Sequence, residues 1–159
     1  MKSLLKFVGI GILAVAASGT LLAQSNPLVG TWKLNSEKSK FNPGPAPKSL
    51  TRTVAAQGDG VLYTFDGISA DGTTIAYSFA LNFDGKDNAI TGSMPSGADS
   101  ISAQRIDSNT FAATLKQAGK VIGTSKVEVS QDGKVTTVTS KGATATGQAT
   151  NDVSVYNKQ

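Results

Sequence analysis

The chain has 159 residues, with 15 Lys and Arg against 11 Asp and Glu, and it contains no His and no Cys. The missing His excludes Ser-His-Asp triads, His-ligated zinc and His acid–base chemistry, while the missing Cys excludes disulfide scaffolds and an acylated lipoprotein cysteine. The basic residues are dispersed along the chain, which is a poor footprint for nucleic-acid binding, so no nucleic-acid partner is expected.

Residues 1–23 have the layout of a secretory signal peptide. A basic start precedes an apolar run over residues 7–23, and the sequence turns polar at Gln24. The run is shorter than the roughly 20 residues of a membrane-spanning helix. We therefore predict a signal helix cleaved after Ala23, with a cut near Ala17 and an uncleaved anchor as alternatives. The mature protein is then expected in the periplasm or the medium, without stable membrane insertion.

The sequence from residue 24 to residue 159 predicts one domain of short strands separated by turn sequences. Asp-Gly pairs recur at turn positions, and apolar and small or polar residues alternate between them, most clearly over 73–83. The predicted strands are Leu28–Asn35, Leu50–Ala56, Val61–Phe65, Thr73–Phe83, Ala89–Gly92, Ser100–Ile106, Thr110–Lys116, Val121–Ser130, Val135–Ser140 and Val153–Tyr156. Hairpins this regular predict an all-β, single antiparallel up-and-down barrel of about 8–10 strands.

Two segments interrupt this rhythm. Ser36–Lys48, which we call the proline-rich segment, carries Pro43, Pro45 and Pro47. Proline lacks a backbone donor, so neither a regular helix nor a central strand is expected there, and a loop is predicted. Gly142–Asn151 is small and polar, and is predicted to be a loop or a thin strand.

The two ends of this domain carry motifs that resemble those of a known fold family. "VGTWKL" (Val29–Leu34) places a Gly-x-Trp on the first strand, and "VSVYNK" (Val153–Lys158) forms the last strand. With the strand count, these ends resemble the calycins, that is, the lipocalins and the intracellular fatty-acid-binding proteins. The resemblance implies that Gly30 permits a close backbone approach and that Trp32 plugs the barrel against the last strand. The alternative is an ordinary buried Trp in a β domain.

The sequence also departs from fatty-acid-binding proteins. That family holds the ligand carboxylate with an Arg two residues before a Tyr on the last strand, whereas here Ser154 precedes Tyr156. The helix-turn-helix lid of that family is replaced by the proline-rich segment. Fatty acid is therefore not implied as the ligand, and the resemblance carries over only the barrel.

Candidate ligand-binding residues are the aromatic residues on apolar strand faces and one arginine. The candidates are Tyr63, Phe65, Tyr77, Phe79, Phe111, Tyr156 and Arg105. The aromatic residues would either line a cavity or fill a packed core. Arg105 shares a strand face with apolar residues, as does Arg52, and an inward guanidinium would grip an anion. The alternative for either arginine is a strand-end residue that reaches solvent.

These observations predict an exported, non-catalytic, monomeric barrel that binds or sequesters a small, largely apolar ligand. No cofactor and no metal are expected, because no Asp spacing matches a calcium loop. One alternative is a solid-core structural or protein-interaction module. Another is an atypical enzyme, in which Lys would have to serve as the base for a Ser or Thr nucleophile.

Overall fold

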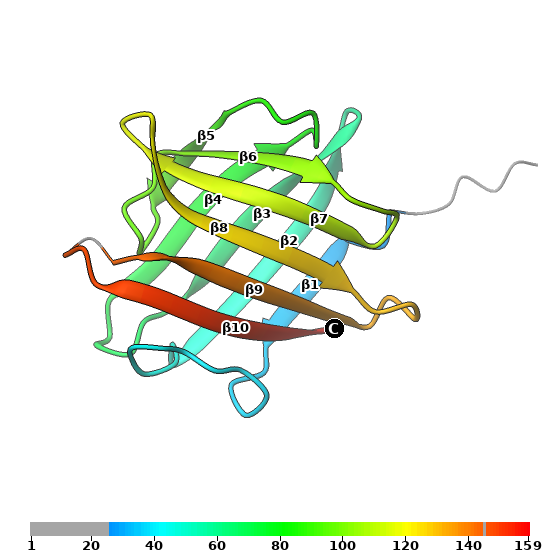
Figure 1. The fold of residues 1–159 in the computed structure, drawn as a ribbon. Helices are drawn as coiled ribbons and strands as arrows, with labels where there is room; N and C mark the ends of the chain where they lie inside the picture. The colour runs from blue at the N-terminus through cyan, green and yellow to red at the C-terminus, as the bar shows by residue number, and fades with distance from the viewer. Residues whose placement is uncertain (1–25, 145) are drawn as a thin grey trace, which may run out of the picture.

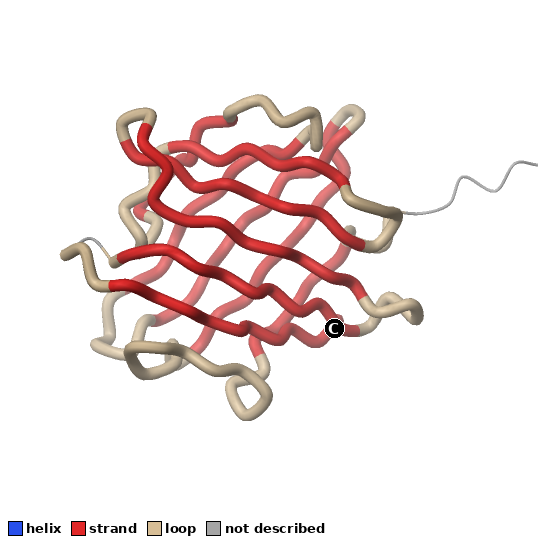
Figure 2. The backbone as a smooth tube through the Cα atoms, in the orientation of Figure 1, coloured by secondary structure: helices blue, strands red, loops and turns tan. Residues whose placement is uncertain are grey.

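The computed structural model describes residues 26–144 and 146–159, which form one closed antiparallel β-barrel (Figures 1 and 2). The strands are β1 (Gly30–Leu34), β2 (Ser49–Gln57), β3 (Gly60–Ile68), β4 (Thr74–Leu81), β5 (Asn88–Ser93), β6 (Ser100–Arg105), β7 (Thr110–Gln117), β8 (Lys120–Val129), β9 (Val135–Ala143) and β10 (Ala149–Lys158). Each strand pairs with its sequence neighbours, and β10 pairs with β1. The predicted all-β up-and-down barrel is confirmed, whereas the predicted signal helix lies outside the described residues. Among the described residues, no helix is long and apolar enough to cross a membrane.

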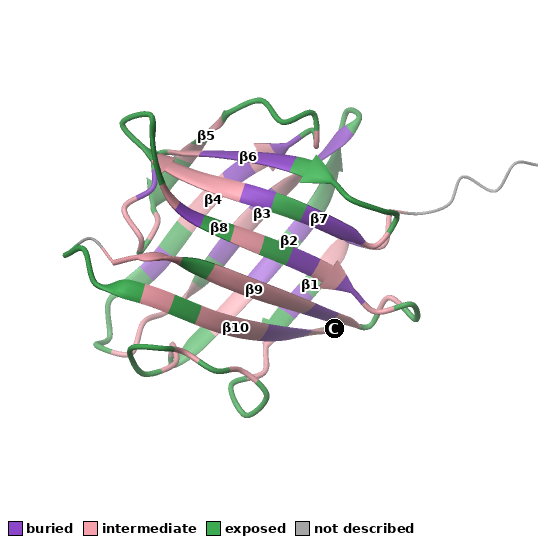
Figure 3. Cartoon of the chain, in the orientation of Figure 1, coloured by how far each residue is buried: buried purple, intermediate pink, exposed green. Residues whose placement is uncertain are grey.

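Period-2 patterns place the core side chains inside the barrel. On β3, the side chains of Val61, Tyr63 and Phe65 are buried, and the residues between them are more exposed. Figure 3 shows the same alternation of buried and exposed residues along the strands nearest the viewer. The prediction for β4 runs too far, because Phe83 has a φ of 58°, which turns the chain out of the strand.

Closure of the barrel depends on the first strand. Trp32 pairs with Arg52 of β2 on one side and with Lys158 of β10 on the other, and its side chain is 0% exposed. Its indole Nε1 donates a hydrogen bond to the carbonyl oxygen of Leu28 at 2.8 Å. Gly30 has a φ of 139°, and a Cβ there would lie 2.6 Å from Lys158 Cε. Trp32 thus has the structural role that the resemblance implied. At Gly30 the near neighbour is the end of the Lys158 side chain and not backbone, so it is the positive φ that favours glycine there.

The proline-rich segment contains turns and a single bridge, as predicted, and it runs beside β10 (Figure 1). Lys40 and Val153 exchange two backbone hydrogen bonds of 2.7 and 2.8 Å. Asn42 accepts a hydrogen bond from the backbone N–H of Asn151 and donates its own backbone N–H to Asp152 Oδ1, both at 2.8 Å. The segment is therefore tied to the first half of β10.

The small, polar region predicted as a loop or thin strand contributes strand residues at both ends. Gly142 and Ala143 finish β9, and β10 begins at Ala149. Gly142 lies close to the neighbouring strand, because a Cβ there would be 2.6 Å from the carbonyl oxygen of Ile122. The lack of a side chain thus lets β8 and β9 stay paired where the barrel curves.

Candidate ligand-binding cavity

The barrel is hollow over part of its length and packed solid over the rest. It contains a cavity of about 820 Å³ that is partly open to solvent, a size typical of small-molecule sites. Several buried apolar side chains lie outside the lining of this cavity and make up what we call the packed end: Leu28, Trp32, Val54, Val61 and Val129. The interior therefore agrees with the cavity interpretation of the sequence and not with a solid core.

Six of the seven predicted contact residues line this cavity: Tyr63, Phe65, Tyr77, Phe79, Phe111 and Tyr156. The structure brings four of these rings together on β3 and β4. Phe65 and Tyr77 are a directly opposed pair with ring centroids 4.5 Å apart and planes 11° from parallel. Tyr63 and Phe79 form the next pair, with centroids 5.3 Å apart. Such stacked pairs hold one another rigidly, so this wall is preorganised for an apolar molecule.

The opposite wall, on β8 to β10, carries small hydroxyl side chains. Ser125 and Ser140 face each other across the β8–β9 pair with their Oγ atoms 2.9 Å apart. Ser154 of β10 also lines the cavity. The residues from the proline-rich segment that complete the lining are Phe41, Pro43, Gly44, Pro45 and Pro47. The wall on β3 and β4 is thus aromatic, whereas the wall on β8 to β10 combines hydroxyl side chains with the apolar Ile122, Val127 and Val138. The proline-rich segment contributes to the boundary.

Arg52 is the feature that the aromatic pattern did not reveal. It lies in the middle of β2 with only 2% of its surface exposed, and it lines the cavity. Its Cζ atom is 4.4 Å from the ring centroid of Tyr156, 5.3 Å from that of Trp32 and 5.7 Å from that of Tyr63. Because Trp32 belongs to the packed end, Arg52 lies on the cavity floor between the hollow and solid parts.

The guanidinium of Arg52 lacks polar partners. None of the ion pairs among the described residues involves it, and its Nε and Nη2 atoms are buried without a hydrogen-bond acceptor. Burial lowers the pKa of Arg52 from its ordinary value, because a charge out of water is disfavoured. An arginine nevertheless keeps its proton in a protein, so the cavity floor carries a positive charge.

Two buried hydroxyls also have no hydrogen-bond partner among the described residues. They belong to Tyr63 and Thr136. Burial raises the pKa of Tyr63 to about 12, although the nearby positive charge of Arg52 opposes this shift. Burial likewise raises the pKa of Tyr156. Both phenols are therefore neutral at ordinary pH, and Tyr63 has a proton to donate.

Arg105 is the one predicted contact residue that the structure places elsewhere. It is the last residue of β6 and is exposed, with its Cζ 4.4 Å from the ring centroid of Phe83. Its Nη1 donates a hydrogen bond to the carbonyl oxygen of Ser108 at 3.2 Å. Arg105 is therefore not among the residues that line the cavity, and its predicted contact with a ligand stays a prediction. The inward arginine is Arg52.

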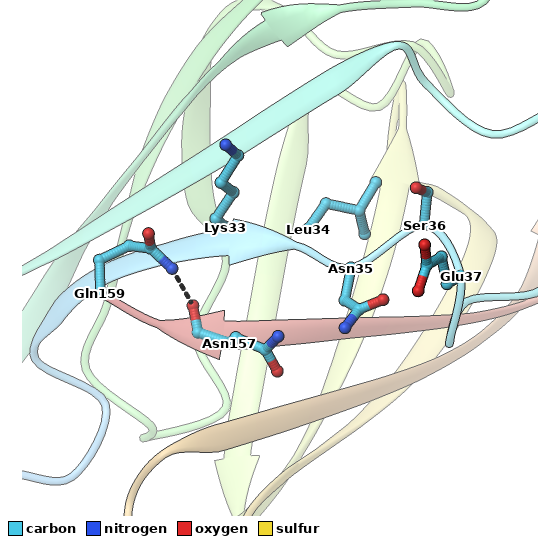
Figure 4. A pocket seen from close by; sticks show the side chains of 7 residues that line it. All are labelled: Lys33, Leu34, Asn35, Ser36, Glu37, Asn157 and Gln159. Carbon is cyan, nitrogen blue, oxygen red and sulfur yellow. Dashed lines mark hydrogen bonds between the residues drawn. The ribbon is translucent and has the colours of Figure 1, made fainter.

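A second, smaller depression lies on the outside of the barrel. It has a volume of about 270 Å³ and is lined by residues of β1, the turn after it and the chain end: Lys33, Leu34, Asn35, Ser36, Glu37, Asn157 and Gln159 (Figure 4). Besides the strand pairing of Lys33 with Asn157, a side-chain hydrogen bond runs from Gln159 Nε2 to the carbonyl oxygen of Asn157 at 3.2 Å. The buried unpartnered polar atoms of the described residues lie elsewhere, so this depression is not a candidate site.

No protein-family model and no curated protein matches the chain, whereas solved structures do. Rv2717c from M. tuberculosis is 14% identical and superposes with a TM-score of 0.52, covering 84% of this chain and 93% of its own. The zebrafish ileal bile acid-binding protein in complex with cholic acid is 12% identical, with a TM-score of 0.46, and covers 84% of this chain and 99% of its own. The redesigned beta barrel mFAP1 bound to DFHBI is also 12% identical, with a TM-score of 0.44, and covers 83% and 95%. The chain shares with Rv2717c the fold of a closed antiparallel β-barrel.

Proposed function

We propose that this protein is a non-catalytic, exported barrel that binds or sequesters a small, largely apolar molecule in its interior. The observation that carries the proposal is the cavity of about 820 Å³, which has a rigid aromatic wall. Clefts of this size with mostly apolar lining and a few buried polar groups are typical of small-ligand sites. The packed-module alternative required a filled interior, so the cavity favours a binder.

The proposal that the protein has no catalytic activity is supported by the surroundings of the cavity hydroxyls. A serine nucleophile needs a base within hydrogen-bond distance. Among the described residues no hydrogen bond joins a cavity serine to a lysine: Ser125 pairs with Ser140, and Ser69 donates to Asp71. The Asp71 carboxylate is a weak base, because the hydrogen bonds from Ser69 and Thr73 lower its pKa to about 2. The site therefore offers binding groups in place of an activated nucleophile. The proposal of export rests on the sequence of residues 1–23 alone.

Native mass spectrometry of the protein purified from its own host tests the proposed function. We expect a fraction of the protein to carry the added mass of one small molecule, released on denaturation. A matched pair of variants on β7 provides the control. Ala113 is buried and lines the cavity, whereas its neighbour Ala112 is exposed on the outer face. Ala113→Phe should abolish the added mass and Ala112→Phe should keep it; a wild-type protein always free of small molecules would contradict the proposal.

A further inference from the structure

We infer that the ligand carries a carboxylate group, and that Nε and Nη2 of Arg52 bind its two oxygens on the floor of the cavity. The inference rests on the proposed function and adds the chemical class of the ligand and the orientation in which it binds. The acidic group points toward the packed end at Trp32. The apolar remainder lies along the aromatic wall of β3 and β4.

The two unpartnered donors of Arg52 have the geometry that a carboxylate needs. Nε and Nη2 are the two nitrogens on one side edge of a guanidinium, so their free N–H bonds run parallel in one plane. A carboxylate presents two coplanar oxygens at matching separation, and such fork-to-fork pairs are the strongest hydrogen bonds that arginine makes. Both atoms are shielded from water, have no acceptor among the described residues, and belong to a side chain that lines the cavity. The cavity floor thus carries a two-pronged donor without a protein acceptor, and a small turn of the guanidinium toward the cavity would bring it to the acid.

The buried positive charge of Arg52 also has no acidic counterpart among the described residues. A buried cation is normally compensated by an acid, because its desolvation costs several kcal/mol. The two acidic residues of the cavity lining accept hydrogen bonds from the backbone. Asp71 accepts one from the N–H of Thr73 at 2.9 Å, and Asp152 accepts one from the N–H of Asn42 at 2.8 Å. No described acidic residue forms an ion pair with Arg52. The missing counter-charge is therefore assigned to the ligand.

The side chains around Arg52 add a further hydrogen-bond donor and hold the guanidinium in place. The Tyr63 hydroxyl is buried without a partner among the described residues, and the centroid of its ring is 5.7 Å from Arg52 Cζ. Its O–H is a third donor, beside the two N–H groups of Arg52, for the carboxylate of the ligand. The rings of Tyr156 and Trp32 confine the guanidinium at 4.4 and 5.3 Å. The arginine comes from β2, whereas Ser154 occupies the last-strand position at which fatty-acid-binding proteins place theirs. The anion site of this chain is accordingly built from different strands.

Paired probes that differ only in the acidic group test the inference. We would titrate the protein with 9-anthracenecarboxylic acid and 9-anthracenemethanol, and with decanoic acid and decanol, following the emission of Trp32, the only Trp of the chain. Each acid should bind about 10- to 100-fold more tightly than its alcohol, the range expected for hydrogen bonds to a charged group. Arg52→Met should remove this preference. Arg52→Lys keeps the positive charge but lacks the two parallel N–H donors, so it should retain a part of the preference for acids. Arg105→Met should leave this preference unchanged.

The outcomes separate the inference from the proposed function. If none of the four probes binds the wild-type protein, the proposed function fails and the inference fails with it. If the wild-type protein binds each alcohol as tightly as its acid, the inference is overturned while the proposed function stands. The inference is likewise overturned, and the proposed function kept, if Arg52→Met retains the preference for acids. The comparison of acid with alcohol needs only wild-type protein, so a poorly folding variant would not prevent the test.

Discussion

Replacing Arg52 by Met should leave the ligand-free barrel at least as stable as the wild type. Methionine keeps most of the length and apolar volume of the arginine stem but has no charge and no donors. In the wild type, two donor nitrogens are buried without partners. An unsatisfied buried donor costs about 1–3 kcal/mol. The substitution removes this cost together with the desolvation of an unpaired cation.

The opposing effect is the attraction between the guanidinium and the surrounding aromatic rings. The three rings lie at 4.4, 5.3 and 5.7 Å, and each cation–π contact is worth about 0.5–2 kcal/mol. One charge cannot gain the full attraction of three rings, so we expect a total of about 2–3 kcal/mol. Removal of the two unsatisfied donors alone gains about 2–6 kcal/mol. The difference of these ranges runs from a loss of about 1 kcal/mol to a gain of about 4 kcal/mol. Its middle places the free energy of unfolding of Arg52→Met about 1–2 kcal/mol above that of the wild type.

Urea denaturation followed by circular dichroism measures this difference without relying on the emission of Trp32. Arg105→Met is the matched control, because Arg105 also lies 4.4 Å from an aromatic ring but is exposed. Its free energy of unfolding should change by no more than about 0.5 kcal/mol. A decrease of about 2 kcal/mol or more in the free energy of unfolding of Arg52→Met would contradict this prediction. Such a decrease would show that the guanidinium stabilises the packed end of the ligand-free barrel.

Three further substitutions test the cavity and its boundary. Ala113→Phe should lower the affinity for decanoic acid by tenfold or more, because the added ring enters the cavity. Ala112→Phe, whose ring lies on the outer face, should leave the affinity unchanged. Calorimetry measures both affinities, and equal effects of the two variants would argue against a hollow interior. Phe79→Ala should cost less than the roughly 3–5 kcal/mol of a fully packed Phe in urea denaturation, because one side of the ring faces the cavity. Asp152→Ala should speed both the association and the dissociation of decanoic acid in stopped-flow experiments. The substitution frees the backbone N–H of Asn42 and so loosens the proline-rich segment at the cavity boundary. Asp152→Asn retains an acceptor oxygen and should behave like the wild type.

The strands of this barrel follow closely from the sequence, because turn chemistry and period-2 alternation are both local signals. The predicted strand over 89–92 is β5, and the long strand over 73–83 is β4 except at its end. There the apolar alternation continues through Phe83, but a left-handed φ ends the strand. Alternation reports which face a side chain is on, and it cannot report that the backbone has turned.

The candidate site was predictable only in part. The alternation placed the aromatic side chains inside, but it could not say whether they fill the barrel, since a lining ring and a packed ring have the same pattern. Arg52 and Arg105 each share a strand face with apolar residues, and the pattern alone treats them alike. The difference is position within the strand: Arg52 is the fourth residue of a nine-residue strand, and Arg105 is the last of six. A preference for mid-strand arginines would have identified the buried one.

A crystal structure of the protein grown with 9-anthracenecarboxylic acid would show where the acidic group lies. We predict one ligand inside the barrel, with its carboxylate oxygens within hydrogen-bond distance of Nε and Nη2 of Arg52. Its rings should lie along the wall formed by Tyr63, Phe65, Tyr77 and Phe79. A ligand whose carboxylate points toward the proline-rich segment and solvent would rule out this anion site, and a barrel whose side chains fill the interior would rule out the cavity.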